Sequence, residues 1–334
     1  MDLEDDVKKF VLVFLAFLVL GAAGLFFGRG YIINEWQFSE DKEKGEISIT
    51  GYNGRKRELV IPSEINGKPV TDIDSLVFAY KSTQNKVESV KIPDSVLYIY
   101  KSFYDMPKLK SVDLGTGIMR IGSNSFQNCE SLCEISIPDS VIRIGSNVTD
   151  DTKCPFSGCS SLENVIFNED KTEFTGGCFE GTPWLENQRN GEAYAVIHDR
   201  VTGGGNAEGS VVIDKGFEIA EMAFMNNDKI TEVTIGGNID TIGFAAFIGC
   251  DSLKNVVIED GVVTIEKSSF YACPSLEQIT IPDSVQIIED GAIKCVQFLE
   301  DGEIKKGNLK ILCSSQSAAL RYAEEHEIDY ELLE

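Results

Sequence analysis

Apolar residues recur along this chain at a fixed interval of about 23 positions. The interval is 23 residues from Ile235 to Ile258 and again from Ile258 to Ile281, and the step from Ile137 to Phe167 is seven residues longer. An aromatic column follows the same period: Phe103, Phe126, Phe156, Phe179, Phe224, Phe247 and Phe270. A constant period of this length is typical of a solenoid, in which each repeat forms one coil.

Each repeat carries too little apolar surface to fold alone. A leucine column holds Leu109, Leu132, Leu162, Leu185, Ile230, Leu253 and Leu276. An isoleucine column holds Ile99, Ile121, Ile144, Phe174, Ile219, Ile242, Ile265 and Ile288. Roughly six apolar side chains, at about 2 kcal/mol each on burial, do not offset the ordering of a whole repeat at about 1.5 kcal/mol per residue. Stacked coils bury a continuous core, so the pattern predicts one long array.

The end of each repeat alternates apolar and polar residues, as in the segment Leu253 to Ile258, LKNVVI. This period of two predicts a short strand. A proline or glycine often follows, such as Pro282 after Ile281, and turns the chain out of the strand. Stacking therefore predicts a parallel β ribbon. The segment around each phenylalanine fits either a tight helical turn or a second short strand.

The strand residues that alternate outward are the candidates for partner binding. They are Ser111, Asp113, Glu134, Ser136, Asn164, Ile166, Glu232, Thr234, Asn255, Val257, Gln278 and Thr280. Solenoids commonly bind along such an extended face. The alternative is a solvated sheet face that binds nothing.

The amino terminus carries a long apolar run. Residues 10–27 read FVLVFLAFLVLGAAGLFF, which as a helix spans about 27 Å, close to the thickness of a bilayer core. We predict a transmembrane signal anchor over residues 10–28. Lys8 and Lys9 favour a cytoplasmic tail over residues 1–9, and residues 29–45 are predicted as a juxtamembrane stalk with Trp36 at the membrane interface. The alternatives are a cleaved signal peptide and a buried helix, but the acidic start MDLEDD and the absence of a polar face favour the anchor.

The charge balance excludes one class of partner. The chain has a formal net charge of −24, and such a surface repels phosphate backbones, so nucleic acid is not expected as a ligand. No cofactor is expected, and the chain has only two histidines, His198 and His326.

The nine cysteines are an odd number, so they cannot all pair within the chain. Four lie three residues after a column phenylalanine and are predicted to be buried free thiols: Cys129, Cys159, Cys250 and Cys273. With Cys133 and Cys154, two of these also show the spacing C-x3-C…C-x4-C of a zinc site. A Cys154–Cys159 disulfide is a second alternative. Because Cys129 and Cys159 belong to the inward column, we favour thiols over metal.

No catalytic set stands out, so we do not expect an enzyme. His198 and Asp199 are adjacent, but no motif ties a serine or cysteine nucleophile to them; a hydrolase using His198 is the alternative. Gly203, Gly204 and Gly205 lack the lysine and spacing of a phosphate loop and are predicted to form a hairpin turn.

Several segments resemble the BspA-like (TpLRR-type) class of bacterial leucine-rich repeat surface proteins, whose pattern is roughly IPxSV, then xxIGxxAF, then xxCxxL. Residues 235–253, IGGNIDTIGFAAFIGCDSL, and residues 281–292, IPDSVQIIEDGA, follow it closely. FEGTPWL at residues 179–185 resembles the degenerate coil of that class, and SSQSAALRYAEEHEIDYELLE resembles its closing helix and strand. The departures are Lys171, Ile293 in place of the last phenylalanine, and an insertion at residues 147–153.

The resemblance covers residues 46–334 and sets the expected organisation. An opening repeat is expected over residues 46–85, the solenoid over 86–299 with an irregular excursion at 186–211, and a helical cap over 300–334. The class implies surface exposure and binding to a protein or host matrix, in adhesion or recognition. Together with the predicted anchor, this leads us to expect a single-pass protein of the cell membrane whose repeats lie outside and bind a protein or glycoprotein. The alternative function is a structural scaffold for envelope protein assembly.

Overall fold

The computed structural model describes residues 25–27, 30–33, 35–75, 77–78, 85–145, 154–168, 171–298 and 304–333. The predicted cytoplasmic tail, residues 10–24 and 28 of the predicted anchor, and the insertion at residues 147–153 lie outside the described residues. Among the described residues, no helix has both the length and the apolar character needed to cross a membrane.

A sheet opens the described chain, and it includes residues predicted as a stalk as well as Leu25–Phe27, which were predicted as the end of the transmembrane helix and instead form a strand. Its order is β1 (Leu25–Phe27), β2 (Gly30–Ile33), β3 (Trp36–Asp41), β4 (Glu46–Tyr52), β7 (Lys68–Ile73) and β6 (Glu64–Ile65). Instead of lying at a membrane interface, the Trp36 ring packs on Tyr52 and Phe78, with centroid distances of 4.5 and 6.3 Å. The folded unit therefore begins before residue 46, because β3 pairs antiparallel with β4 and the aromatic rings gain contacts in the sheet.

The predicted parallel strands form what we call the long-strand ribbon. In the first half of the chain it contains β5 (Glu58–Val60), β8 (Ser89–Lys91), β10 (Ser111–Asp113), β12 (Glu134–Ser136) and β14 (Asn164–Ile166). In the second half it contains β18 (Gly209–Ile213), β20 (Ile230–Ile235), β22 (Asn255–Ile258), β25 (Gln278–Thr280), β30 (Lys310–Cys313) and β31 (Asp329–Leu332). Equivalent residues pair directly, so that Val233 lies beside Val256 and Val256 beside Ile279.

The isoleucine column forms a second, short-strand ribbon. It contains β9 (Tyr98–Ile99), β11 (Arg120–Ile121), β13 (Arg143–Ile144) and β15 (Glu173–Phe174), and then β16 (Ala195–Ile197), β17 (Arg200–Thr202), β19 (Glu218–Ile219), β21 (Thr241–Ile242), β23 (Thr264–Ile265) and β26 (Ile287–Ile288). Two small pairs complete the strands: β24 (Phe270–Tyr271) with β27 (Ile293–Lys294), and β28 (Val296–Phe298) with β29 (Ile304–Lys306).

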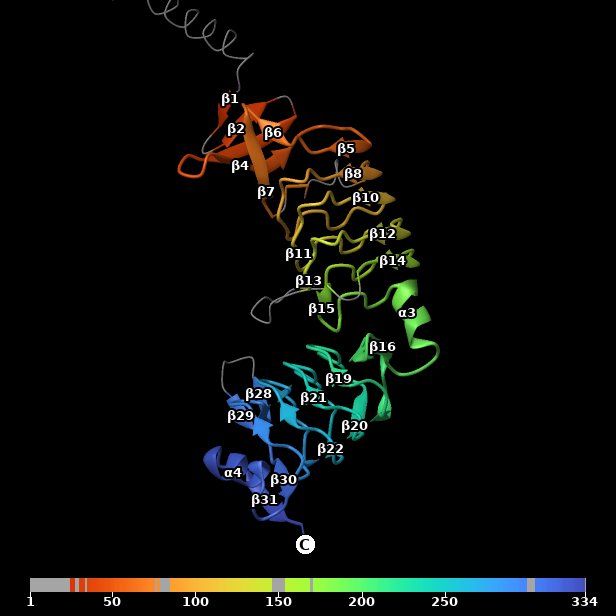
Figure 1. Ribbon diagram of the computed structural model, residues 1–334, viewed down its shortest axis with the longest axis vertical. Coiled ribbons are helices and arrows are strands. Elements are labelled where there is room, and N and C mark those ends of the chain that lie inside the picture. The colour runs from red at the N-terminus through yellow and green to blue at the C-terminus, as the bar shows by residue number, and fades with distance from the viewer. Residues whose placement is uncertain are drawn as a thin grey trace, which may run out of the picture.

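The stack of coils bends near its middle, where α3 (Pro183–Arg189) and β16 lie (Figure 1). The long-strand ribbon, seen at β10, β12 and β14, lies on the outer side of the bend. The short-strand ribbon, seen at β11, β13, β19 and β21, lies on the inner side. The predicted binding strands are thus on the convex side of the solenoid.

The phenylalanine column forms a stack of rings inside the coils. Consecutive rings from Phe78 to Phe179 are nearly parallel, with centroids 5.0 to 5.5 Å apart. The stack resumes from Phe224 to Phe270 at 4.8 and 5.2 Å. Gly204 occupies the interruption, where a Cβ would lie 2.0 Å from the Phe224 ring. The core is accordingly divided into two clusters that meet around residues 194–201.

At Phe270 the predicted second short strand forms, as β24, but around the other column phenylalanines the turn is neither of the two structures that the sequence fitted. Residues two positions before and two positions after the aromatic residue often adopt a left-handed conformation, as at Ala245 before Phe247 and Asn226 after Phe224. A left-handed residue interrupts both a helix and a strand, and it costs roughly 1–2 kcal/mol for a residue with a Cβ. Hydrogen bonds between coils stabilise it: Phe247 N–H donates to the Ser269 carbonyl over 2.8 Å.

The irregular excursion contains one helix and one hairpin. Thr182 caps α3 by accepting a hydrogen bond from Leu185 N–H over 3.2 Å, and Trp184 of α3 packs edge-on against Phe179. The hairpin joins β16 and β17 through His198 and Asp199, both left-handed. The predicted hairpin at the three glycines is therefore misplaced: Gly204–Asn206 forms the short 3-10 turn η2 instead.

A buried arginine ties the excursion to the coil before it. The Arg189 side chain, only 3% exposed, donates to the Gly203 carbonyl over 2.7 Å and to Glu180 over 2.7 Å, and it also pairs with Glu186. Across the same junction Arg143 pairs with Glu221. These contacts satisfy the buried guanidinium, since an unpaired buried charge would be strongly destabilising.

The carboxyl end closes the stack with the helix α4 (Ala318–Glu325) and with β31, which pairs parallel with β30. Phe247 and Phe270 donate their N–H groups to the coil that follows, but Ile293 has no coil after it. The Tyr322 hydroxyl bonds to this residue instead. It accepts a hydrogen bond from Ile293 N–H over 3.1 Å and donates one to Ile293 C=O over 3.2 Å. One side chain thus replaces the backbone of a missing coil.

We predict that Tyr322→Phe lowers the free energy of unfolding by about 1–3 kcal/mol, because both buried backbone groups of Ile293 lose their partner. Urea titration followed by circular dichroism measures this change. The matched control Tyr330→Phe, on the exposed strand β31, should change it by less than about 0.5 kcal/mol. Equal losses in the two variants would contradict the terminating role of Tyr322.

Candidate binding surfaces

The twelve predicted partner-binding residues all lie on the long-strand ribbon. Nine have exposed side chains, and Thr234, Asn255 and Thr280 are half-buried. Their neighbours along each strand, such as Val233 and Val256, are buried, so the predicted alternation holds.

The structure brings these residues together in three groups. Glu134 and Ser136 on β12 lie beside Asn164 and Ile166 on β14. Six residues on β20, β22 and β25 form two rows, one running Glu232, Asn255, Gln278 and the other Thr234, Val257, Thr280. Ser111 and Asp113 instead pair with Ser89 and Lys91 on β8, which the sequence analysis did not select.

Charged groups at the first of these strands are already paired. Lys91 Nζ lies 2.8 Å from an Asp113 carboxylate oxygen. This hydrogen bond, helped by one from Gly115 N–H, lowers the pKa of Asp113. Both side chains are more than half exposed, so the pair contributes little to stability.

Apolar side chains interrupt the polar ribbon at several strands. Ile166 is 62% exposed and Val257 is 40% exposed, and Val60 and Val212 are exposed at equivalent positions. Exposed apolar residues that repeat along one face are typical of an interaction surface. Val60 and Val212 were missed because their coils are irregular, although each lies between two apolar neighbours with the same strand alternation.

A second apolar column lies on the inner side of the bend. Leu97, Met119 and Ile142 stand two residues before the isoleucine column, and each is 37 to 51% exposed. Their backbones stack, since Met119 N–H donates to Leu97 C=O and Ile142 N–H to Met119 C=O. This column was not predicted, although its 22- and 23-residue spacings are visible in the sequence.

The four column cysteines are buried thiols, as predicted. Each donates to the carbonyl of a column phenylalanine in the coil before it: Cys129 to Phe103, Cys159 to Phe126, Cys250 to Phe224 and Cys273 to Phe247, at 3.1 to 3.2 Å. A thiol suits this interior position because it is small and can still donate a weak hydrogen bond.

The structure does not assemble the alternative cysteine sites. Cys133 is exposed, whereas Cys129 and Cys159 face the core, and Cys154 and Cys159 are both free thiols. Within the described part of the chain, no group of three histidine, cysteine, aspartate or glutamate residues is arranged to hold a metal ion.

His198 borders a small cavity of about 190 Å³ between β15 and β17. Lys171, Glu173 and Arg200 also line it, and its lining contains no serine or cysteine. The His198 ring lies 6.1 Å from the Phe167 ring, between centroids. His198 thus lies in the turn between β16 and β17.

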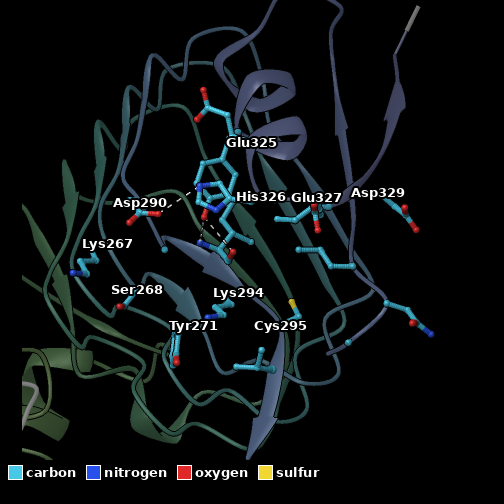
Figure 2. A pocket seen from close by; sticks show the side chains of 18 residues that line it. Lys267, Ser268, Tyr271, Asp290, Lys294, Cys295, Glu325, His326, Glu327 and Asp329 are labelled. Carbon is cyan, nitrogen blue, oxygen red and sulfur yellow. Dashed lines mark hydrogen bonds and ion pairs between the residues drawn. The ribbon is translucent and has the colours of Figure 1, made fainter. Parts of the chain in front are cut away.

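A larger pocket of about 640 Å³ lies between the last regular coil and the cap. Figure 2 shows Lys267, Ser268, Tyr271 and Lys294 on the coil side, and Glu325, His326 and Glu327 on the cap side. The His326 ring stacks 4.2 Å from the Tyr322 ring, and its Nε2 lies 3.6 Å from Asp290. Lys294 Nζ stands 5.8 Å from the centre of the Tyr271 ring. No sequence pattern indicated this pocket.

The repeat register agrees with a known family. Six copies of the BspA type Leucine rich repeat region match residues 71–201 and 217–316. The chain belongs to the BspA-type leucine-rich repeat family. Leucine-rich repeat proteins generally bind other proteins.

Several solved structures are similar to this BspA-type chain. A leucine rich cell surface protein from Faecalibacterium prausnitzii is 20% identical, over 89% of this chain and 98% of that one, with a TM-score of 0.35. The T. pallidum leucine-rich repeat protein TpLRR is 21% identical, over 66% and 78%, with a TM-score of 0.37. The pneumococcal vaccine antigen PcpA is 15% identical, over 93% and 100%, with a TM-score of 0.41. No curated protein matches the chain.

We predict that iodoacetamide at pH 8 labels Cys133 in the native BspA-type solenoid and leaves the four column thiols unmodified. Burial raises the pKa of Cys129 and Cys250 well above the ordinary thiol value and that of Cys273 to about 12, and only the thiolate is reactive. Peptide mass spectrometry measures the labelling, with a sample in guanidinium as the positive control. Native labelling of Cys273 at the rate of Cys133 would contradict the burial of this column.

Proposed function

We propose that the apolar segment ahead of β1, residues 10–24 of the predicted anchor, holds this protein in the bacterial membrane and that the solenoid is displayed on the cell surface, where the long-strand ribbon binds a protein or glycoprotein. The observation that carries the binding role is that exposed apolar residues, such as Ile166 and Val257, recur at the same position of separate strands among polar neighbours. The anchor rests on the uncharged apolar sequence that begins at residue 10 and continues up to β1.

The ribbon fits a partner with an extended surface. Its strands present side chains in rows that run from coil to coil at about 4.8 Å. A contact that covers several coils combines many weak polar contacts with a few buried apolar ones, as protein interfaces do. The outer side of the bend leaves the ribbon accessible to a large ligand (Figure 1).

We propose binding rather than catalysis as the activity. In the two cavities described above, no nucleophilic side chain is hydrogen-bonded to a base. The side chains of the twelve ribbon residues differ in chemical type from strand to strand. Turnover of an ester, peptide or glycoside by the purified chain, abolished by His198→Ala, would overturn this part of the proposal.

Protease treatment of intact cells tests the location. We predict that external protease removes the repeats, and that the intact protein recovered from untreated membranes retains residues 1–27 by mass spectrometry. Lysed cells serve as the control for protease access. Repeats that stay protected until lysis would contradict surface display and would favour an internal scaffold.

The binding face can be tested with a matched pair of substitutions. We predict that Val257→Ser on the long-strand ribbon weakens binding to host-matrix proteins at least tenfold, because an apolar contact is lost at the interface. Ile287→Ser, at an exposed aliphatic position on the short-strand ribbon, should leave binding unchanged. Surface plasmon resonance on immobilised collagen, laminin and fibronectin measures both. The reverse result would move the site to the inner side of the bend, and co-purification of envelope proteins alone would favour the scaffold alternative.

A further inference from the structure

The pocket at the end of the solenoid contains hydrogen-bond donors that the coils elsewhere use. Two residues after a column phenylalanine, Asn226, Gly249 and Ala272 each donate their N–H to the next coil, at 2.8 to 3.0 Å. Two residues before it, Ala245 and Ser268 do the same, at 3.1 and 3.2 Å. The N–H groups at the same positions of the last coil would therefore need an acceptor outside the regular coils.

In the last coil the central donor has a partner and the outer two do not. Ile293 N–H bonds to Tyr322, but the N–H groups of Gly291 and Cys295 have no protein acceptor among the described residues. Gly291 and Cys295 both line the pocket. A backbone N–H at a pocket wall binds a carbonyl or carboxylate oxygen favourably.

The lysines and most carboxylates of the pocket stand on opposite walls; the exception is Asp290, on the coil side, whose carboxylate lies 3.6 Å from His326 Nε2 of the cap. Lys267 and Lys294 stand on the coil side, and neither forms an ion pair within the described part of the chain. Glu325, Glu327 and Asp329 stand on the cap side (Figure 2). Between them the buried residues Ile293, Val296 and Leu309 provide apolar lining.

We propose that this pocket binds a short peptide with free termini, whose carboxylate contacts Lys294 and the Cys295 N–H and whose ammonium contacts the carboxylates of the cap, Glu327 foremost. This site is independent of the long-strand ribbon and of the protein ligand proposed for it.

Size and charge both favour this ligand class. A pocket of about 640 Å³ lies within the range of roughly 300–1,000 Å³ found for small-molecule sites. A simple anion would be repelled by a chain of net charge −24, and a simple cation would leave the two lysines and the open N–H groups unused. A zwitterion is neutral overall, and its carboxylate can contact the lysines while its ammonium contacts the carboxylates of the cap.

Calorimetric titration of the full chain with tripeptides Ala-X-Ala tests the proposal, with X as Leu, Ser, Asp or Lys. Each peptide is used with free ends, with an acetylated amino terminus, with an amidated carboxyl terminus, and with both ends blocked. The variants are Lys294→Gln and Glu327→Gln. Their matched controls are Lys254→Gln and Glu277→Gln, which alter exposed residues outside the pocket.

At least one free peptide should bind saturably, and both controls should bind it like the unaltered protein. Amidation of the peptide and Lys294→Gln should each weaken binding about tenfold or more, and the two losses should not add, because they remove the same contact. Acetylation and Glu327→Gln should behave in the same way. The proposal is overturned if no free peptide binds, if doubly blocked peptides bind equally well, or if the paired losses add fully.

Discussion

Contact between consecutive coils is the constraint on which the rest of this structure depends. No coil can bury its own apolar side chains, so each must lie against the next at a distance set by backbone hydrogen bonds. Strands in a ribbon repeat at about 4.7–4.9 Å. The phenylalanine rings repeat at 4.8 to 5.5 Å between centroids, which suits offset stacking of aromatic faces. Backbone and side chains therefore impose nearly the same rise on the stack.

The same constraint explains how the stack of coils is closed at its amino and carboxyl ends. At the amino end, the Trp36, Tyr52 and Phe78 rings continue the aromatic stack into a different sheet. At the carboxyl end, the Tyr322 hydroxyl satisfies one residue of the last coil. Burial raises the pKa of this hydroxyl, so it stays a donor at ordinary pH. Because one hydroxyl replaces only the middle of a coil, unused donors remain on either side of it.

Features that repeat by translation could be predicted from the sequence. The strands, their register and the buried cysteines follow from columns of one residue type, since equivalent residues of stacked coils must meet. The left-handed residues could not be predicted in the same way. Met222 and Ala245 do not favour that conformation, and the hydrogen bonds that their N–H groups donate to the next coil stabilise it.

Features built from unrelated segments were missed for a different reason. Trp36 belongs to antiparallel strands outside the 23-residue period, so the period gives no sign that it joins a sheet. The terminal pocket joins Lys267, Lys294 and Glu327, which belong to two coils and a cap and share no column. Only the folded chain brings such residues together.

The Tyr322 contact has an evolutionary consequence. Because it touches only the last coil, whole coils can be duplicated or lost upstream without altering the way the chain ends. The area of the long-strand ribbon and the chemistry of the terminal pocket can then change separately, the first by the number of coils and the second by point substitution. Relatives with different numbers of coils that keep a tyrosine here would share the same closing contact, although their long-strand ribbons would differ in length.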